Sequence, residues 1–198
     1  MSIYNLSPSP QQAEPFAFWE RGFGVDELTR IRNEGDAMLD PMSNLNATVG
    51  AGELLVDVRR SQIGWFTTEN AIWLYDKLGW IVRQLNGQYF QFDLTGFSEH
   101  MQYTYYSSTY QGHYDWHVDA GRGPDVAPRK LSLIVQLSAP DEYEGGDVEL
   151  MYKQQAEVLS RDQGIVYAFP SWMLHRVMPV TAGTRRSLVV WLSGPRWR

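Results

Sequence analysis

The run of short β-like segments after about residue 99 constrains the fold of this chain more than any other feature of its sequence. Turns rich in Gly, Pro and Asp separate these segments, as they do between β-strands. The expected strands are HMQYTYYSS, WHVDA, KLSLIVQLS, DVELMY, GIVYAF, MLHRVMPV and RRSLVVWLS. Strands at this density, without helices between them, favour a β-sandwich or jelly roll over a parallel α/β sheet.

Two amphipathic helices are expected before these strands. The stretch GVDELTRIRNEGDAMLD places Leu28, Ile31 and Leu39 at near-helical spacing, with Asp26 as the candidate N-cap. The stretch TTENAIWLYDKLGWIVRQLNG repeats the pattern more strongly and ends at Gly87. Two tryptophans of this second helix are expected in the core: Trp73 and Trp80. We therefore expect a mainly β fold with N-terminal helices.

The length of 198 residues fits a single domain. We divide it into a loose N-terminal arm (1–15), a helical support (16–98) and a jelly-roll core (99–198). The formal net charge of -6 gives no bulk attraction to nucleic acid or anionic lipid, so neither is an expected partner. No apolar run approaches the roughly 18 residues of a membrane span, and no signal-peptide pattern opens the chain. A soluble, cytoplasmic protein is the expectation.

Two tandem His-x-Asp pairs stand out in GHYDWHVDAG, namely His113-x-Asp115 and His117-x-Asp119. The chain has no cysteine, so a bound metal must use imidazole and carboxylate ligands. Residues i and i+2 of a strand share a face, so either pair can reach one ion. A ferrous site of two imidazoles and one carboxylate needs one more histidine. His175 is the candidate, because a jelly roll can bring its late strand beside an early one.

A basic residue follows on the last expected strand. The stretch TRRSLVVWL places Arg185 and Ser187 on one face of that strand, and Arg186 on the other face, where we expect it at the surface. A guanidinium can grip one carboxylate of a dicarboxylic acid bidentately, and a nearby hydroxyl can add one more hydrogen bond. A lone His-x-Asp pair is a weak signal, but its combination with His175 and Arg185 is much rarer.

With these motifs, the sequence resembles the iron(II)/2-oxoglutarate dioxygenases, and within them the prolyl 4-hydroxylase-like branch that includes bacterial PKHD-type hydroxylases. The stretch LSAPDEYEGGDVEL resembles the turn and Gly-Gly strand entry between the two metal-binding segments of that family. The stretch FPSWMLHRVMPVTAGTR resembles its second-histidine strand. The resemblance covers roughly residues 99–193. It implies a double-stranded β-helix, a cupin-like jelly roll, with supporting helices.

The resemblance also implies roles for individual residues. His117, Asp119 and His175 would bind iron, and Arg185 would hold the C5 carboxylate of 2-oxoglutarate. Further co-substrate contacts are expected from Tyr106, Ser187 and Trp191. The family places its metal pair at a strand end, and glycines and a proline follow Asp119 directly, so the pair at 117 and 119 is favoured. The upstream pair, His113 and Asp115, is assigned to the approach surface.

The sequence departs from the family in two places beside the expected co-substrate pocket. Gln136 stands where relatives often carry Tyr or Phe at the end of the strand before the Gly-Gly turn. The run YTYYSSTYQGHY is unusually rich in tyrosine, so Tyr103 or Tyr105 could take part of the role given to Tyr106. Both departures concern the far end of the co-substrate.

Other polar and aromatic residues have less specific expectations. His100 is expected in a turn, and the Arg59-Arg60 pair as a salt-bridged surface pair. Trp65 is a candidate at the substrate entrance. Aromatic residues near the strand mouth could pack on a proline-like ring or form rim packing: Tyr110, Tyr114 and Trp116.

The function that the resemblance implies is hydroxylation of an unactivated C–H bond with iron(II), 2-oxoglutarate and oxygen, and with ascorbate as an optional accessory. The substrate would be a prolyl or other amino-acid side chain in a peptide or protein. Asp119 favours hydroxylation, since related halogenases lack this carboxylate. Two alternatives stay open: a metal-free jelly-roll module that binds a sugar or peptide, and a zinc hydrolase with Glu99 or Asp115 as general base.

Overall fold

The structure is a computed structural model that describes residues 14–39, 45–49, 52–120 and 128–195. Most of the expected N-terminal arm, residues 1–13, lies outside these ranges. The glycines and the proline expected to end the strand after Asp119 also lie outside them, within residues 121–127.

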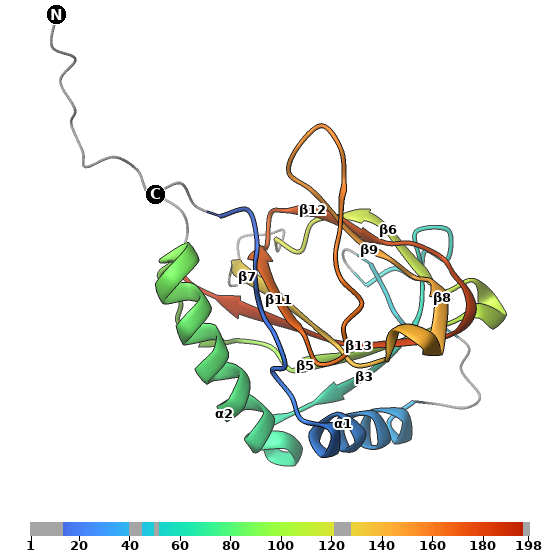
Figure 1. Cartoon of the computed structure of the whole chain (residues 1–198), viewed down its shortest axis with the longest axis horizontal. Helices are drawn as coiled ribbons and strands as arrows, with labels where there is room; N and C mark the ends of the chain where they lie inside the picture. The colour runs from blue at the N-terminus through green and yellow to red at the C-terminus, as the bar shows by residue number, and fades with distance from the viewer. Residues whose placement is uncertain (1–13, 40–44, 50–51, 121–127, 196–198) are drawn as a thin grey trace, which may run out of the picture.

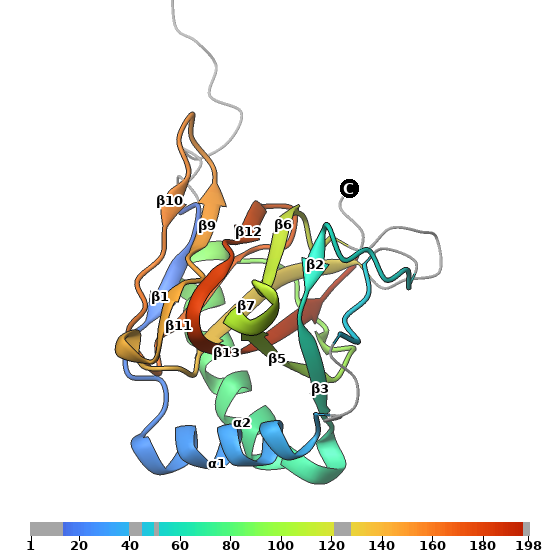
Figure 2. The ribbon, with the colours of Figure 1, turned by 90° about the vertical axis from the view of Figure 1, so that its right-hand side faces the viewer.

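The described strands form two antiparallel sheets that face each other (Figures 1 and 2). Their bounds are β1 (Ala17–Trp19), β2 (Arg59–Arg60), β3 (Gln62–Phe66), β4 (Gly96–Phe97), β5 (Met101–Ser107), β6 (His113–His117), β7 (Arg129–Gln136), β8 (Tyr143–Gly145), β9 (Val148–Met151), β10 (Glu157–Val158), β11 (Val166–Pro170), β12 (Leu174–Val177) and β13 (Val180–Ser193). The larger sheet has the order β1-β11-β7-β13-β5-β3, with β4 and β8 also paired to β13. The smaller sheet has the order β10-β9-β12-β6-β2. The mainly β architecture predicted from the sequence is confirmed.

Two helices cover the outer face of the larger sheet, opposite the smaller one (Figures 1 and 2). They are α1 (Val25–Ala37) and α2 (Thr68–Leu85), and α2 continues into the π-helical turn η1 (Asn86–Phe90). Short 3-10 turns are η2 (Ser108–Tyr110) and η3 (Pro140–Glu142). Leu28 and Ile31 of α1 and Leu74 and Leu78 of α2 are buried in one core with Leu133 of the sheet. Burial of these apolar faces fixes the helices on the sheet.

The N-cap of α1 differs from the expectation. Gly24 occupies that position, and its backbone N–H donates to Glu27 Oε2 at 2.8 Å. Asp26 lies inside the first turn, where its carboxylate still faces the positive end of the helix dipole. The cap of α2 is Thr67, whose hydroxyl accepts from the Asn70 N–H at 3.4 Å. The expected boundary at Asp26 was therefore two residues late.

The segment expected as helical support, residues 16–98, also contributes strands to both sheets. β1 pairs with β11 and β3 with β5 in the larger sheet, and β2 pairs with β6 in the smaller one. These edge strands are short and pair with strands far away in sequence, so no local periodicity predicts them. Trp80 is likewise not in the core, because it is 47% exposed and packs edge-on against Trp19. Trp73 is partly buried against the core, as expected.

Gly35 of α1 lies directly against the ring of Tyr103 in β5. A Cβ added at Gly35 would come within 2.5 Å of that ring. The ring is held in place by a hydrogen bond from its hydroxyl to Asp36 Oδ1 (2.5 Å). We expect Gly35→Ala to lower the free energy of unfolding by about 1–3 kcal/mol, because overpacking outweighs the gain in helix propensity. Urea denaturation measures the loss, and unchanged stability would mean that α1 shifts away from the sheet without cost.

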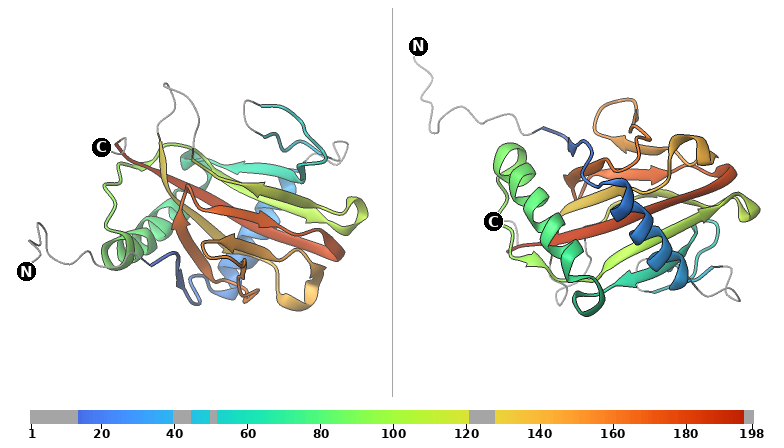
Figure 3. Two further views of the ribbon diagram at one scale, coloured as in Figure 1. Left: turned by 90° about the horizontal axis from the view of Figure 1, so that it is seen from above. Right: turned by 60° about the horizontal axis from the view of Figure 1, so that its bottom comes forward.

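Alternation along β13 divides its side chains between the two faces of the larger sheet. Leu188 and Val190 join the core under the helices, while Arg185, Ser187 and Trp191 face the space between the sheets. The view from above in Figure 3 shows β13 running the length of this sheet. Among the described residues, no helix is long and apolar enough to span a membrane.

Candidate metal centre

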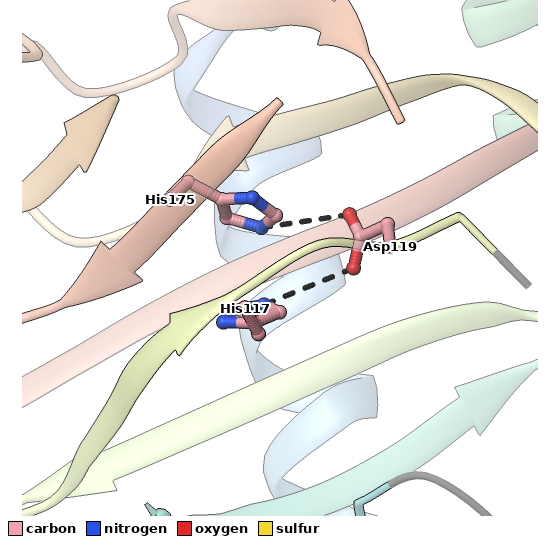
Figure 4. A group of neighbouring side chains, drawn as sticks. All are labelled: His117, Asp119 and His175. Atoms are coloured by element: carbon pink, nitrogen blue, oxygen red, sulfur yellow. Dashed lines mark ion pairs between the residues drawn. The ribbon is translucent and has the colours of Figure 1, made fainter. Parts of the chain in front are cut away.

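Three side chains with metal-binding donor atoms meet between the two sheets. His117 ends β6, His175 lies directly opposite it on β12, and Asp119 follows two residues after the strand. One ligand atom from each residue lies within 4.8 Å of the others. Figure 4 shows the carboxylate between the two imidazoles, with Asp119 Oδ1 3.8 Å from His117 Nε2 and Oδ2 3.5 Å from His175 Nε2. The three donors therefore converge on one point.

A β-bulge in β6 decides which of the tandem pairs faces inward. His117 pairs with His175, but the next pairing on the inner face is Tyr114 with Val177, so two residues of β6 oppose one of β12. The bulge brings His117 and Tyr114 to the same face, and Asp115 is left exposed outside. Strict alternation would have placed all four polar side chains on one face. The expected strand WHVDA is thus displaced, since β6 begins at residue 113 and ends at residue 117.

The upstream pair lies away from the metal centre. The imidazole of His113 contacts backbone carbonyls, with Nδ1 2.9 Å from Gln111 O and Nε2 3.3 Å from Asp57 O. The Asp115 carboxylate accepts the backbone N–H of Trp116 at 2.8 Å. Neither side chain lines the cavity between the sheets.

Hydrogen bonds fix both imidazoles in the form that a metal needs. His117 Nδ1 lies 2.7 Å from Asp115 O, and His175 Nδ1 lies 2.9 Å from Met173 O. Because a carbonyl oxygen only accepts, Nδ1 carries the hydrogen in each ring and Nε2 presents its lone pair. Burial, with a further contribution from His175, lowers the pKa of His117 to about 3. His117 is therefore neutral at physiological pH.

The carboxylate of Asp119 fits a bound cation. It is buried, and its Oδ2 makes no hydrogen bond within the described part of the chain. Burial by itself would raise the pKa of Asp119, but His175 and His117 outweigh it and the pKa is lowered. A buried anionic oxygen without a partner is costly unless a cation pairs with it. Two imidazole nitrogens and one carboxylate form the donor set that suits non-haem iron(II).

A cavity of about 220 Å³ extends from these ligands toward Arg185. Arg185 is 1% exposed, and its guanidinium donates to Gln136 Oε1 at 3.0 Å and to Ser187 Oγ at 3.4 Å. Gln136 in turn donates through Nε2 to the Tyr143 hydroxyl at 2.8 Å. A guanidinium has five N–H donors, so several remain for a ligand in the cavity. The buried positive charge makes this end of the cavity a candidate anion site.

The tyrosine-rich strand β5 presents one of its three candidate tyrosines to this cavity. Tyr106 is 3% exposed, lines the cavity, and has its ring centre 5.6 Å from Arg185 Cζ. Tyr103 and Tyr105 point to the helix side, where Tyr103 bonds Asp36 and Tyr105 lies against Arg186. Arg186 is not a free surface residue, because it forms an ion pair with Asp36 of α1 at 3.0 Å.

At its other end, the cavity is bordered by an ion pair and a tryptophan. Arg129 donates two hydrogen bonds to Glu99, at 2.6 and 2.5 Å, and its guanidinium lies 3.8 Å from the ring centre of Trp191. Trp191 is 6% exposed and lines the cavity, as does Trp65, which is 39% exposed. Arg129 also donates to the Asp119 carbonyl at 3.3 Å, so the ion pair lies beside the segment that carries the carboxylate ligand.

Arg59 was expected in a surface ion pair, and the structure corrects this. It is 6% exposed, donates to Gln102 Oε1 at 2.7 Å, and lies over the ring of Tyr114, 4.6 Å from its centre. Tyr114 stacks in turn on His117, with ring centres 3.4 Å apart. Because β2 has only two residues and no apolar alternation, the sequence carried no signal for this burial.

Three other expectations are placed outside the cavity. Trp116 packs against Arg176 on the outer face of the smaller sheet, 4.5 Å from its guanidinium carbon. The Tyr110 hydroxyl donates to the Tyr105 carbonyl at 3.1 Å. His100 is exposed. Of the aromatic residues expected near the strand mouth, Tyr114 is the one that lines the cavity.

Two imidazoles and one carboxylate beside a cavity in a jelly roll form the donor set of a candidate mononuclear iron centre. The comparison with known families agrees. Residues 101–193, slightly less than half of the chain, match the model of the 2OG-Fe(II) oxygenase superfamily.

Curated relatives match a part of the chain of similar length. The chain is 33% identical over 84 residues to a PKHD-type hydroxylase of Alteromonas mediterranea, covering 40% of this chain and 37% of that protein. It is 37% identical over 87 residues to a PKHD-type hydroxylase of Teredinibacter turnerae, covering 41% and 38%. The matches thus span less than two fifths of the length of each relative.

Solved structures with the same fold cover nearly the whole chain. A prolyl-4-hydroxylase of Pseudomonas putida superposes with a TM-score of 0.67 at 18% identity, covering 92% of this chain and 94% of that one. A prolyl hydroxylase of Trichoplax adhaerens, in complex with a hypoxia inducible factor peptide fragment, gives a TM-score of 0.69 at 15% identity, covering 90% and 83%. The predicted double-stranded β-helix is confirmed by this likeness.

Proposed function

We propose that this protein is an iron(II)- and 2-oxoglutarate-dependent hydroxylase that acts on a prolyl or other amino-acid side chain in a peptide or protein. The observation that carries the proposal is the convergence of His117, Asp119 and His175 at one end of a cavity whose other end holds the buried Arg185. A dicarboxylic co-substrate needs both ends: a metal for its 2-oxo acid group and a cation for its far carboxylate.

Within this proposal, the cavity residues have separate tasks. His117, His175 and Asp119 would hold the ion, and their net single negative charge offsets half of its double positive charge. Arg185 would bind the far carboxylate, with the Ser187 hydroxyl beside it. When bound, iron with 2-oxoglutarate and oxygen supplies the oxidising chemistry that hydroxylates a C–H bond and releases succinate and carbon dioxide.

The remaining walls keep water away from the reacting groups. Ile134, Val177 and Val189 present apolar side chains to the cavity. Tyr106 and Trp191, both nearly buried, close it on the side of the larger sheet. A dry cavity strengthens the attraction between Arg185 and an anionic ligand, because the effective dielectric constant falls.

The choice of a prolyl or related side chain rests on the relatives. The curated proteins similar to this chain are named PKHD-type hydroxylases, and the Trichoplax neighbour holds a peptide. Tyr114, which lines the cavity beside His117, offers a ring face on which a pyrrolidine can pack.

The structure disfavours the two alternative functions. A metal-free binding module leaves the buried Oδ2 of Asp119 without a hydrogen-bond partner among the described residues. A zinc hydrolase needs a general base near the ion, but Glu99 is tied to Arg129 by two hydrogen bonds and Asp115 is exposed outside the cavity. Hydrolysis therefore has no positioned base in the described structure.

Anaerobic titration of the protein with iron(II) and 2-oxoglutarate tests the proposal. A weak visible charge-transfer band is expected when both are present, and neither alone should produce it. Admission of oxygen, with ascorbate as an accessory reductant, should then release succinate. Absence of the band although iron and 2-oxoglutarate are both present at saturating concentration would overturn the proposal in favour of a binding module.

A further inference from the structure

A groove of about 960 Å³ runs along α2, separate from the metal cavity. One wall is the α2 face that carries Tyr75, Asp76, Gly79 and Arg83, and the opposite wall includes Phe97. Tyr75 and Phe97 meet edge to face, with ring centres 5.2 Å apart. A further hollow of about 280 Å³ shares Gly79, Arg83 and Phe97 and continues the groove along the helix. Aromatic-lined grooves of this kind suit extended, proline-containing chains.

The groove adjoins the metal cavity. Trp65 lines both, and the ion pair between Glu99 and Arg129 stands between them, with Glu99 in the groove and Arg129 in the cavity. A chain whose target residue enters the cavity past Trp65 can therefore continue into the groove. The 220 Å³ cavity alone would hold little more than one side chain beside the co-substrate.

The length of the groove fits a peptide. Because α2 is kinked at Ala71, the straight part of the helix that lines the groove runs from Tyr75 to Asn86. A helix rises about 1.5 Å per residue, so this distance is about 16 Å. An extended chain advances about 3.3 Å per residue, so this part of the groove accommodates about five residues.

Gly79 keeps the middle of the groove open. A glycine inside a helix costs about 1 kcal/mol relative to alanine. Packing does not require it here, because a Cβ at Gly79 would meet its nearest neighbour, a Phe97 ring carbon, at an ordinary 3.6 Å. Gly35 of α1, in contrast, has no room for a Cβ. The glycine at position 79 is therefore not required by core packing, and its missing side chain leaves the groove open.

Two opposite charges lie along the groove without partners. Asp76 and Arg83 are exposed, and neither side chain makes an ion pair or a hydrogen bond within the described residues. They are seven positions apart on the helix, which is about 10 Å or about three residues of an extended chain. Asp76 is the nearer of the two to the Trp65 end. A ligand with a basic and an acidic residue about three positions apart would complement both charges.

From these features we propose that the α2 groove binds the extended segment of a peptide or protein substrate that flanks the hydroxylated residue. Asp76 binds a basic side chain of this segment, and Arg83 binds an acidic side chain about three residues farther from the target. This inference rests on the proposed function, because the cavity at the Trp65 end must receive the target residue. It assigns the protein to chain substrates rather than free amino acids.

Fluorescence anisotropy with labelled 12-residue peptides tests the groove without any turnover. Each peptide contains one proline, one Lys and one Glu three positions apart, in the order Lys-x-x-Glu or Glu-x-x-Lys. The wild-type protein is expected to bind the order that places Lys nearer the proline about fivefold more tightly, since each exposed ion pair is worth up to about 1 kcal/mol. The double variant Asp76→Lys, Arg83→Asp is expected to prefer the other order. Equal affinities, or a preference that the double variant keeps, would overturn the proposal.

The second part of the test fills the groove with a larger side chain at position 79. Gly79→Gln is expected to fold at least as stably as the wild type and to weaken peptide binding at least tenfold, whereas Gly79→Ala should bind nearly normally. Ile72→Gln places the same side chain on an exposed part of α2 outside the groove and serves as the matched control. Gly79→Gln with wild-type affinity would exclude the groove as the binding site.

Turnover separates this inference from the proposed function. Wild type and Gly79→Gln should release succinate equally with N-acetylproline methylamide, which is too short to enter the groove. If succinate is released but the groove variants bind the 12-residue peptides like the wild type, the groove proposal is rejected and the hydroxylase proposal stands. If peptide binding depends on the order of the charges but no iron–2-oxoglutarate charge-transfer band forms, the groove is a peptide-binding site and the hydroxylase proposal is rejected.

Discussion

His175→Ala is expected to reduce iron-dependent succinate formation to background. His175 supplies one of three converging donors, and its Nδ1 hydrogen bond to Met173 O aims Nε2 at Asp119. Two remaining ligands, both on the segment 117–119, cannot enclose one face of the ion. Equilibrium dialysis followed by metal analysis should show loss of stoichiometric iron, and NMR should detect no succinate.

The matched control is His113→Ala on the same strand as His117. The His113 imidazole hydrogen-bonds with the Gln111 and Asp57 carbonyls outside the cavity, so this variant should keep most of the iron and most of the activity. Circular dichroism checks that His175→Ala is folded, and His117→Ala provides an independent removal of one donor. If His113→Ala were inactive and His175→Ala active, the metal would belong to the upstream pair.

Arg185→Gln is expected to raise the 2-oxoglutarate concentration needed for half-saturation about 100-fold. Loss of a buried, charge-assisted interaction with a carboxylate corresponds to about 3 kcal/mol, and each 1.4 kcal/mol or so is about a factor of ten. Iron affinity in the absence of co-substrate should not change, because Arg185 contacts Gln136 and Ser187 rather than the metal ligands. Titration of the visible band with 2-oxoglutarate measures the effect.

Arg186→Gln is the natural comparison, since Arg186 follows on the same strand but faces α1. Its partly buried ion pair with Asp36 should make the variant about 1 kcal/mol less stable, with an unchanged 2-oxoglutarate requirement. An unchanged requirement in Arg185→Gln would instead move the anion site to Arg59 or Arg129, the other basic residues that line the cavity among the described residues.

Most of the longer strands were predictable because short local patterns, namely β-like runs bounded by turn residues, indicate them. Each of the seven expected runs contains or overlaps a strand, and both helices fall within the expected stretches. The short strands β1, β2, β3 and β4 were not predicted, since their stability comes from distant partners rather than from periodicity. Tertiary pairing of this kind leaves little trace in a short window of sequence.

At the candidate site, the sequence predicted which residues are involved better than it predicted the directions of their side chains. The sequence already pointed to His117, Asp119 and His175, and the structure brings these three together. The residue spacing did not predict the bulge in β6. The bulge places one extra residue of β6 opposite β12, so the side chains before it point to the opposite faces from those that strict alternation predicts. Burial of Arg59 was missed for a related reason, since its partners Gln102 and Tyr114 lie on other strands.

The two halves of the candidate site belong to different sheets. His117 and His175 sit on neighbouring strands of the smaller sheet, whereas Arg185 is anchored in the larger one. A co-substrate held at both ends would act as a clasp between the layers. Its binding energy would then oppose any separation of the sheets, and the folded state would become harder to open as the ligand concentration rises.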